Sequence, residues 1–296
     1  MIRPMADPAG PKMIRVPYIA KPLATLAPRD LLLLEALNPK PTDVALEVGT
    51  GSGSSLLRLA PKVAVLHGVD VSEGAVERLR RALAVTRGPA RRVELFALDF
   101  CDPASPSRLP CRYDLIFSCD TVEHVPRPDV FFRNLHGCLK PGGQILATFP
   151  NEHPRHAHGI TQFELRAELL GLLKSAGFEE ERTTIEVLEM GRAAERIMNL
   201  GWQLPRNAAK RLLRLVRGRR EAPPQTFDET DFYSYADRLG PSVPLINAYC
   251  WAVMVLMSVS RPVFRIKPAT DVIWDRRILI RARRCDAPDT LQADGP

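Results

Sequence analysis

The sequence lacks any recognisable pair of cysteines. The 296 residues include six cysteines, at positions 101, 111, 119, 138, 250 and 285. No C-x-x-C pair occurs, and the spacing is unlike that of zinc ligands or of a disulfide-bonded scaffold. We therefore expect neither a zinc site nor disulfides, and reduced thiols in a cytoplasmic setting.

The N-terminus lacks the apolar segment of a secretory signal. Residues 1–12 read MIRPMADPAGPK, which is rich in proline and has no apolar core. We expect an irregular lead-in here and no export. The composition is otherwise that of an ordinary globular protein, with 45% hydrophobic and 25% charged residues. A chain of this length can form one large domain with an insertion, or two small domains.

Acidic residues are absent from one basic segment. The net charge is +7, and Arg206–Arg220 contains seven basic residues and no acid. On a helix, four of the basic side chains would share one face and three apolar side chains another. Such a helix suits an anionic membrane surface, although a solvated helix packed on the core has the same pattern. The segment has no aromatic side chains to stack on bases, so nucleic acid is a less favoured partner.

Strand-like and helix-like segments alternate along much of the chain. The expected strands are Val44–Val48, Val63–Val69, Val93–Leu98, Tyr113–Cys119, Gln144–Phe149, Thr183–Leu188 and Asp271–Arg284. Four helical segments, at residues 54–60, 73–85, 127–139 and 161–176, lie in four of the five intervals between the first six strands. This alternation predicts an α/β fold with a doubly wound, mostly parallel, seven-stranded sheet.

Residues 190–270 break the alternation, so we expect a helical insertion before the last strand. Four parts follow from these boundaries. Residues 1–40 form a lead-in and a helix, and residues 41–189 form the core. The insertion spans residues 190–270, and residues 271–296 hold the final strand and a tail.

A glycine-rich run follows the first expected strand. Residues Val44–Gly53 read VALEVGTGSG, with glycines at positions 49, 51 and 53. Glycine permits positive φ angles and close approach of a ligand, and the next helix would turn its amide groups toward that ligand. The dinucleotide fingerprint G-x-G-x-x-G fails because its third glycine falls on Ser54. A P-loop is excluded because no Gly-Lys-Ser/Thr follows.

The remaining pattern, E-x-G-x-G-x-G from Glu47, resembles the cofactor loop of class I S-adenosylmethionine (SAM)-dependent methyltransferases. Later segments match that family in order: Asp70, Asp99-Phe100, Ser118–Val125 (SCDTVEHV) and Lys140–Gly143 (KPGG). The Glu-His-Val of the third segment is similar to small-molecule methyltransferases such as those of quinone biosynthesis. The resemblance covers roughly residues 41–188, and it implies a Rossmann-like methyltransferase fold that binds SAM.

The resemblance also implies which residues contact the cofactor. Asp70 is the candidate for the ribose hydroxyls and Asp99 for the adenine amino group, with Phe100 beside the ring. The other implied contacts are Glu47, Gly49, Gly51, Gly53, Val71 and Cys119. Two alternatives remain open, because Asp70 is also an ordinary helix-start residue and Asp99 is also compatible with an exposed loop.

Two residues after the fourth expected strand are candidates for catalysis. Methyl transfer requires that the acceptor be held in line behind the methyl group and shielded from water. If the acceptor is a hydroxyl, a base helps, and the resemblance places His124 at the mouth of the cofactor site. Asp120 is the second candidate. A histidine that caps a turn or packs on the cofactor would account for His124 equally well.

A cluster of histidines follows the fifth expected strand. His153, His156 and His158 form H-x-x-H-x-H. The proline between them and the lack of a helical i,i+4 frame argue against a metal site. We expect a loop that faces the substrate, and no metal.

The expected insertion at residues 190–270 contains apolar segments that could contact the acceptor. The apolar run Ala248–Met257 is too short for a membrane span, and with aromatic residues of 227–235 it would wall a pocket. We therefore predict O- or C-methylation of a small, lipophilic acceptor, lipid-like or quinone-like, by a cytoplasmic protein associated peripherally with a membrane.

Several alternatives to this function stay open. An RNA or protein methyltransferase would use Arg206–Arg220, but such enzymes often carry Asn/Asp-Pro-Pro-Tyr where this chain has Cys-Asp-Thr-Val. A SAM-binding module without activity is the second alternative. A nicotinamide oxidoreductase is disfavoured by Ser54. The sequence carries no signal for the oligomeric state.

Overall fold

The computed structural model describes residues 29, 32–51, 53–84, 93–155, 159–205 and 263–285, with isolated residues 207, 208, 211, 252, 255 and 256. The chain divides into two compact units. The larger unit comprises Leu34–Glu189 and Ile266–Pro296, and the smaller comprises Met1–Leu33 and Met190–Arg265.

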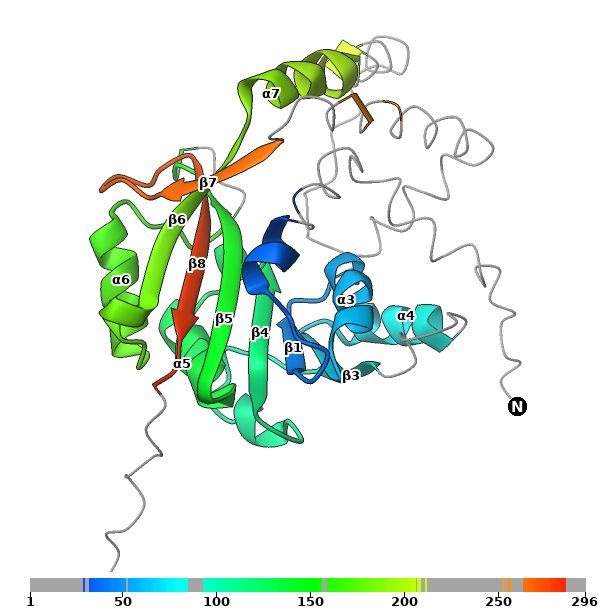
Figure 1. Cartoon of the computed structure of the whole chain (residues 1–296), viewed down its shortest axis with the longest axis vertical. Helices are drawn as coiled ribbons and strands as arrows, with labels where there is room; N and C mark the ends of the chain where they lie inside the picture. The colour runs from blue at the N-terminus through cyan, green and yellow to red at the C-terminus, as the bar shows by residue number, and fades with distance from the viewer. Residues whose placement is uncertain are drawn as a thin grey trace, which may run out of the picture. The chain divides into compact units, whose positions relative to one another are not determined.

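A single sheet of eight strands organises the fold, in the order β3-β2-β1-β4-β5-β8-β6-β7 (Figure 1). The strands are β1 (Val44–Val48), β2 (Val65–Asp70), β3 (Val93–Ala97), β4 (Tyr113–Cys119), β5 (Leu139–Asn151), β6 (Thr183–Met190), β7 (Phe264–Pro268) and β8 (Arg276–Arg283). Strands β1 to β5 pair in parallel, and β8 is antiparallel to both β5 and β6. The prediction of a mostly parallel α/β sheet is therefore confirmed.

The number of strands differs from the prediction. The sheet has eight strands where seven were expected, because β7 forms at its edge within residues predicted to belong to the insertion. Its sequence, FRIKP, has few apolar residues, and none of its residues is buried. Edge strands of this kind carry charged residues and proline, which makes them hard to recognise from hydrophobic pattern.

Short helices connect the strands. They are α3 (Ser54–Leu59), α4 (Glu73–Ala84), α5 (Pro128–Cys138) and α6 (Arg166–Ser175), with single 3₁₀ turns η1 (Ala60–Lys62), η3 (Ser105–Arg108), η4 (Val122–His124) and η5 (Glu180–Arg182). Helix α4 packs on β2 and β3, and α5 contacts α6. Their apolar faces and the strands enclose a core whose largest buried side chains include Tyr113, Phe117, Phe131, Phe132, Phe149 and Phe178.

The strand order places a switch point beside β1. The chain runs from β1 outward to β2 and β3, and then returns to β4 on the other side of β1. In open α/β sheets, ligands bind beyond the carboxyl ends of the strands at such a point. The loops after β1, β2, β3 and β4 are therefore the place for a ligand site.

The smaller unit is described in part. Helix α7 (Arg192–Met198) continues as a π-helical turn, η6 (Asn199–Gln203). Ala194 and Met198 are buried there, whereas Leu200 and Leu204 are exposed. No helix among the described residues is long and apolar enough to cross a membrane. The predictions for Arg206–Arg220, for residues 227–235 and for Ala248–Met257 lie outside the described residues, apart from a few isolated positions.

Candidate active site

The glycine loop after β1 is joined to the end of β2 by backbone and side-chain hydrogen bonds. The amides of Gly49 and Thr50 both donate to the carbonyl of Val69, at 2.8 and 3.2 Å. The amide of Gly51 donates to Oδ2 of Asp70 at 2.8 Å, and the amide of Ser72 donates to Oδ1 at 3.0 Å. The buried Asp70 carboxylate thus links the two loops that any ligand at this edge would touch.

The three glycines of this loop have positive φ angles but different surroundings. A Cβ on Gly49 would lie 2.0 Å from Oγ1 of Thr121, and one on Gly53 would lie 2.5 Å from the Leu79 side chain. A Cβ on Gly51, where φ is +47°, would meet no described atom within 4 Å. Packing against Thr121 excludes a side chain at position 49, and a φ of +74° favours glycine at position 53. Gly51, by contrast, borders open space where a cofactor can approach the backbone.

The residues predicted to hold ribose and adenine lie on neighbouring loops. The amide of Leu98 donates to the carbonyl of Asp70 at 3.0 Å, which brings the loop after β3 beside the loop after β2. Asp99 is exposed in that loop, and its Oδ1 accepts the amide of Cys101. Val71 is apolar yet 71% exposed, so its side chain is available to a flat apolar ligand.

Phe100 and Glu47 point into the protein. Phe100 is only 4% exposed, and its ring packs edge-to-face on Phe131 with 6.1 Å between the centroids. Most of the Phe100 ring therefore faces the core, and its predicted contact with the adenine ring stays a prediction. Glu47 is buried within β1, between Gly68 and Phe117 of the neighbouring strands, and its predicted cofactor contact stays a prediction.

The segment after β4 contacts the glycine loop. Thr121 Oγ1 lies 3.4 Å from the carbonyl of Val48 and 3.3 Å from that of Cys119, which is half-buried. Asp120 has a left-handed φ of +55°, and its carboxylate forms an ion pair with Arg277 of β8. The Arg277 guanidinium therefore engages the Asp120 carboxylate, and the predicted catalytic role of Asp120 stays a prediction.

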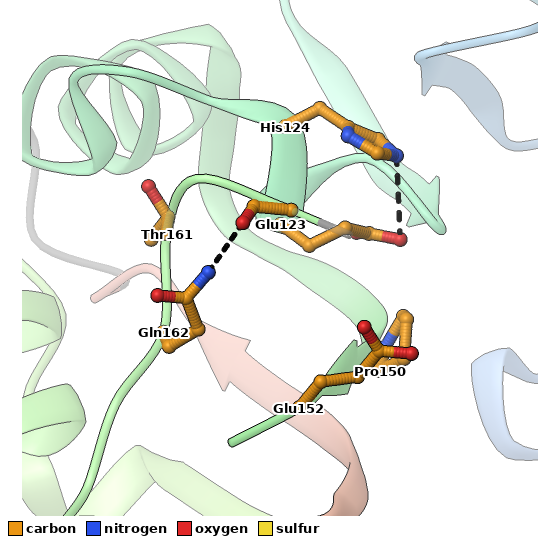
Figure 2. Close-up of a pocket in the computed structure, with 7 residues that line it drawn as sticks. Glu123, His124, Pro150, Glu152, Thr161 and Gln162 are labelled. Atoms are coloured by element: carbon orange, nitrogen blue, oxygen red, sulfur yellow. Dashed lines mark hydrogen bonds and ion pairs between the residues drawn. The ribbon is translucent and has the colours of Figure 1, made fainter. Parts of the chain in front are cut away.

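His124 ends the 3₁₀ turn η4 and lines a small pocket (Figure 2). Its side chain is 41% exposed, and Nε2 lies 3.8 Å from Oε1 of the buried Glu123. The pocket measures about 60 Å³ and is lined by Glu123, His124, Pro150, Glu152, Gly159, Thr161 and Gln162. A volume of this size holds a few atoms, such as the reacting edge of an acceptor, because one water needs roughly 10–15 Å³.

The loop before α6 fixes the floor of this pocket. The amides of Ile160 and Thr161 donate to the carbonyl of Glu123, at 2.7 and 3.1 Å. A Cβ on Gly159 would lie 2.5 Å from the same carbonyl, so only glycine fits there. Gln162 Nε2 donates to the carbonyl of Gly159 at 2.6 Å, and this bond is the dashed line drawn from Gln162 in Figure 2. These hydrogen bonds tie the loop before α6 to η4 beside the pocket.

Sequence reasoning missed several residues of this site. Thr121 stands within the SCDTVEHV segment, where its proximity to His124 is a usable signal. Arg277 has no such signal, because 157 residues separate it from Asp120. Glu152, Thr161 and Gln162 also become neighbours of His124 only through the pairing of distant segments.

The predicted histidine loop is described in part. His153 accepts the amide of Arg155 on Nδ1, and its ring lies 5.2 Å from that of Trp274. His156 and His158 lie outside the described residues. Within the part of the chain that the structure describes, no group of three His, Cys, Asp or Glu side chains is placed to hold a metal ion.

Known proteins with similar sequences are methyltransferases. A family model described as a methyltransferase domain matches residues 46–145. The ubiquinone biosynthesis O-methyltransferase of Thiobacillus denitrificans is 26% identical over 182 residues, covering 55% of this chain and 76% of that protein. The phosphoethanolamine N-methyltransferase 2 of Caenorhabditis elegans is 27% identical over 110 residues, covering 37% of this chain and 24% of that protein.

A solved structure supports the fold. The phosphoethanolamine N-methyltransferase 2 of Haemonchus contortus, in complex with S-adenosyl-L-methionine, superposes with a TM-score of 0.50 at 16% identity, over 92% of this chain and 56% of that one. The open space at Gly51 and the carboxylate of Asp70 suit the same cofactor here. The methyltransferase-domain match and the relatives named as methyltransferases show that this chain is a SAM-dependent methyltransferase, with S-adenosyl-L-methionine as its cofactor.

Proposed function

We propose that this methyltransferase methylates an oxygen of a small acceptor bound in the pocket beside His124. The proposal rests on one short segment, residues 121–124, which contacts the cofactor loop at one end and lines the pocket at the other. Thr121 packs against Gly49 of the cofactor loop, and His124, three residues later, lines the small pocket. A methyl donor at the loop and an acceptor in the pocket would thus be held by the same backbone.

His124 has the chemistry of a general base at this position. Bound SAM supplies an electrophilic methyl group, so the protein has to orient the acceptor and remove its proton. The half-exposed imidazole of His124 would accept the hydroxyl proton as the new bond to oxygen forms, and Glu123 would stabilise the resulting imidazolium. Asp120, paired with Arg277, would support this arrangement without taking the proton.

The pocket and the relatives favour oxygen over other acceptor atoms. The lining includes Glu123, Glu152, Thr161 and Gln162, which suit the hydroxyl groups of an acceptor as hydrogen-bond partners. The relative with the longer match carries out an O-methylation in ubiquinone biosynthesis, according to its name. We therefore propose a hydroxylated, quinone-like acceptor whose lipophilic part extends out of the small pocket.

We also propose that the protein works in the cytoplasm at an anionic membrane surface. Arg206–Arg220 supplies seven positive charges, and exposed Leu200 and Leu204 precede it on the chain. Apolar side chains next to a basic segment suit a lipid interface. Flotation with vesicles of phosphatidylcholine and phosphatidylserine at physiological salt tests this proposal. Protein that stays at the bottom of the gradient with both neutral and anionic vesicles would exclude it.

The acceptor is tested by mass spectrometry with purified protein and SAM. We expect a gain of one methyl group on a catechol probe such as 3,4-dihydroxybenzoate carrying an apolar chain, and none on ethanolamine phosphate, total RNA or total protein. In His124→Ala the rate should fall by about 10²–10⁴-fold with SAM affinity unchanged. Methylation of the amine or of a macromolecule alone would overturn the proposal.

A further inference from the structure

Arg277 and Asp120 form an ion pair that joins distant parts of the chain. Arg277 Nη1 donates to Oδ1 of Asp120 across 157 residues of sequence. Both side chains are only about a quarter exposed, at 26% and 25%. Partial burial weakens the competition from water and salt, so such a pair constrains its surroundings more than a surface pair does.

The pair acts on a backbone turn that needs external support. Asp120 has a φ of +55°, a left-handed conformation that few non-glycine residues adopt. Such residues persist where the surroundings hold them. Here the amide of Asp120 donates to the carbonyl of Thr148 at 2.8 Å, and the side chain is held by Arg277. The turn is thus fixed from β5 and from β8.

This turn sets the positions of the two residues that serve the reaction. Thr121 follows Asp120 directly and packs under Gly49, so a shift of the turn would move the floor of the cofactor loop. His124 is three residues beyond Thr121, and its amide donates to the Thr121 carbonyl at 2.9 Å. A relaxed turn would therefore displace the cofactor loop and His124 together.

Arg277 lies on β8, which is separated from β4 by one strand. In the antiparallel pairing of β5 with β8, Arg277 stands opposite Pro150, which lines the pocket. Strand β5 lies between β4 and β8, so the guanidinium crosses it to reach Asp120 at the end of β4. Strand β8, the last along the chain, thus reaches the active site through one side chain.

We propose that Arg277 is a positioning residue for methyl transfer. Its ion pair with Asp120 holds the left-handed turn, which keeps Thr121 under the cofactor loop and His124 at the pocket. The part that concerns His124 rests on the proposed function, whereas the part that concerns SAM does not.

The test compares Arg277→Met with Arg281→Met. Arg281 lies on the same strand and binds Glu186 of β6 through Nε and Nη2, at 2.9 and 2.7 Å, so its loss removes a comparable ion pair elsewhere. We expect Arg277→Met to raise the SAM dissociation constant about tenfold and to shift the ring signals of His124 in ¹⁵N-histidine spectra. Arg281→Met should change neither, and Arg277→Lys should restore much of the affinity.

A second comparison keeps the proposal testable if Arg277→Met folds poorly. Asp120→Gly removes the carboxylate and accepts the positive φ without strain. In that background Arg277→Met should have no further effect on SAM affinity, because the ion pair is already absent. Unchanged SAM affinity and unchanged His124 signals in Arg277→Met, or full additivity of the two substitutions, would overturn the proposal.

Catalysis gives an independent readout. With the catechol probe, kcat of Arg277→Met should fall at least tenfold. KM for the probe should rise by a smaller factor. If His124→Ala keeps its activity, the proposed function fails, and the SAM measurements still decide the role of Arg277. A kcat equal to that of Arg281→Met would count against positioning.

Discussion

The backbone amide of Gly51 donates a 2.8 Å hydrogen bond to Oδ2 of Asp70, which lies 19 residues further along the chain. The other carboxylate oxygen of Asp70 accepts the amide of Ser72. Each oxygen retains acceptor capacity, so Asp70 can organise the glycine loop and still bind the hydroxyls of a ribose. The cofactor loop and the predicted ribose ligand are therefore one hydrogen-bonded structure.

Replacing Gly51 should abolish SAM binding. In Gly51→Val, a branched side chain enters the open space that the cofactor needs, and φ of +47° adds strain. Isothermal titration with SAM should show no measurable affinity. Gly171→Ala is the matched control, since Gly171 lies in α6 with open space around it; it should bind SAM normally and gain about 0.5–1 kcal/mol of stability. Near-normal affinity in Gly51→Val would refute the site.

Removing the charge of Asp70 should weaken SAM binding strongly. In Asp70→Asn, the amide group cannot accept from both Gly51 and Ser72, so the loop loses one of its attachments. We expect a loss of about tenfold or more in SAM affinity, and no detectable binding in Asp70→Ala.

The control for Asp70 is Asp129→Asn, which removes a surface carboxylate paired with Arg133 on α5. Its SAM affinity should match that of the parent protein. A parallel titration with NAD should show no binding to any of these proteins. Tight NAD binding by the parent would argue for a different cofactor.

Asn151 should be important for stability at the end of β5, next to the pocket. Its side chain is fully buried, donates to the carbonyls of Phe163 and Ile273, and accepts the amide of Phe163. Asn151→Ala leaves these groups without partners and should lower the free energy of unfolding by about 3 kcal/mol or more. Urea titration measures this change. Gln144→Ala, which removes a single bond to the Leu37 carbonyl, should cost only about 1 kcal/mol.

His67 should make the protein less stable in acid. Burial lowers the pKa of His67 from its usual value of 6.5, although Glu94 opposes the shift, and Nδ1 lies 2.9 Å from the Tyr113 hydroxyl. The unfolded chain therefore takes up this proton more readily than the folded protein does. Above about pH 6.5 both states are neutral, and stability should fall as the pH drops below that value.

Two variants separate the proton from the hydrogen bond. His67→Gln removes the titrating group, so unfolding free energies between pH 8 and pH 5 should show a flatter acid slope. Tyr113→Phe keeps the imidazole and should lose about 1 kcal/mol at every pH while it retains the slope. Identical slopes in the parent and in His67→Gln would show that other groups cause the acid sensitivity.

The local features of the active site could be predicted from the sequence. Gly49, Gly51 and Gly53 follow an apolar strand and precede a helix, so the βα turn is recognisable from consecutive residues. Asp70 ends the next strand, and parallel pairing of neighbouring strands brings it beside the loop. Such features depend on short-range geometry and on the regular spacing of βα units.

Other features could not be predicted because they depend on which way side chains point. Phe100 follows Asp99 directly, yet it turns into the core and packs on Phe131 while Asp99 stays exposed. The three glycines look equivalent in the sequence, but only packing against Thr121 and Leu79 distinguishes two of them from Gly51. Strand β7 was not predicted because an edge strand buries little apolar surface.

The sequence by itself determined the class of fold, the cofactor loop and the family, because these depend on the order of local motifs along the chain. The tertiary structure alone decided which residues surround His124 and what holds Asp120. Arg277 reaches Asp120 because β8 inserts antiparallel beside β5, and Gly159 packs on Glu123 because the loop before α6 returns to η4. Contacts of this kind form only when the sheet assembles, so no local pattern records them.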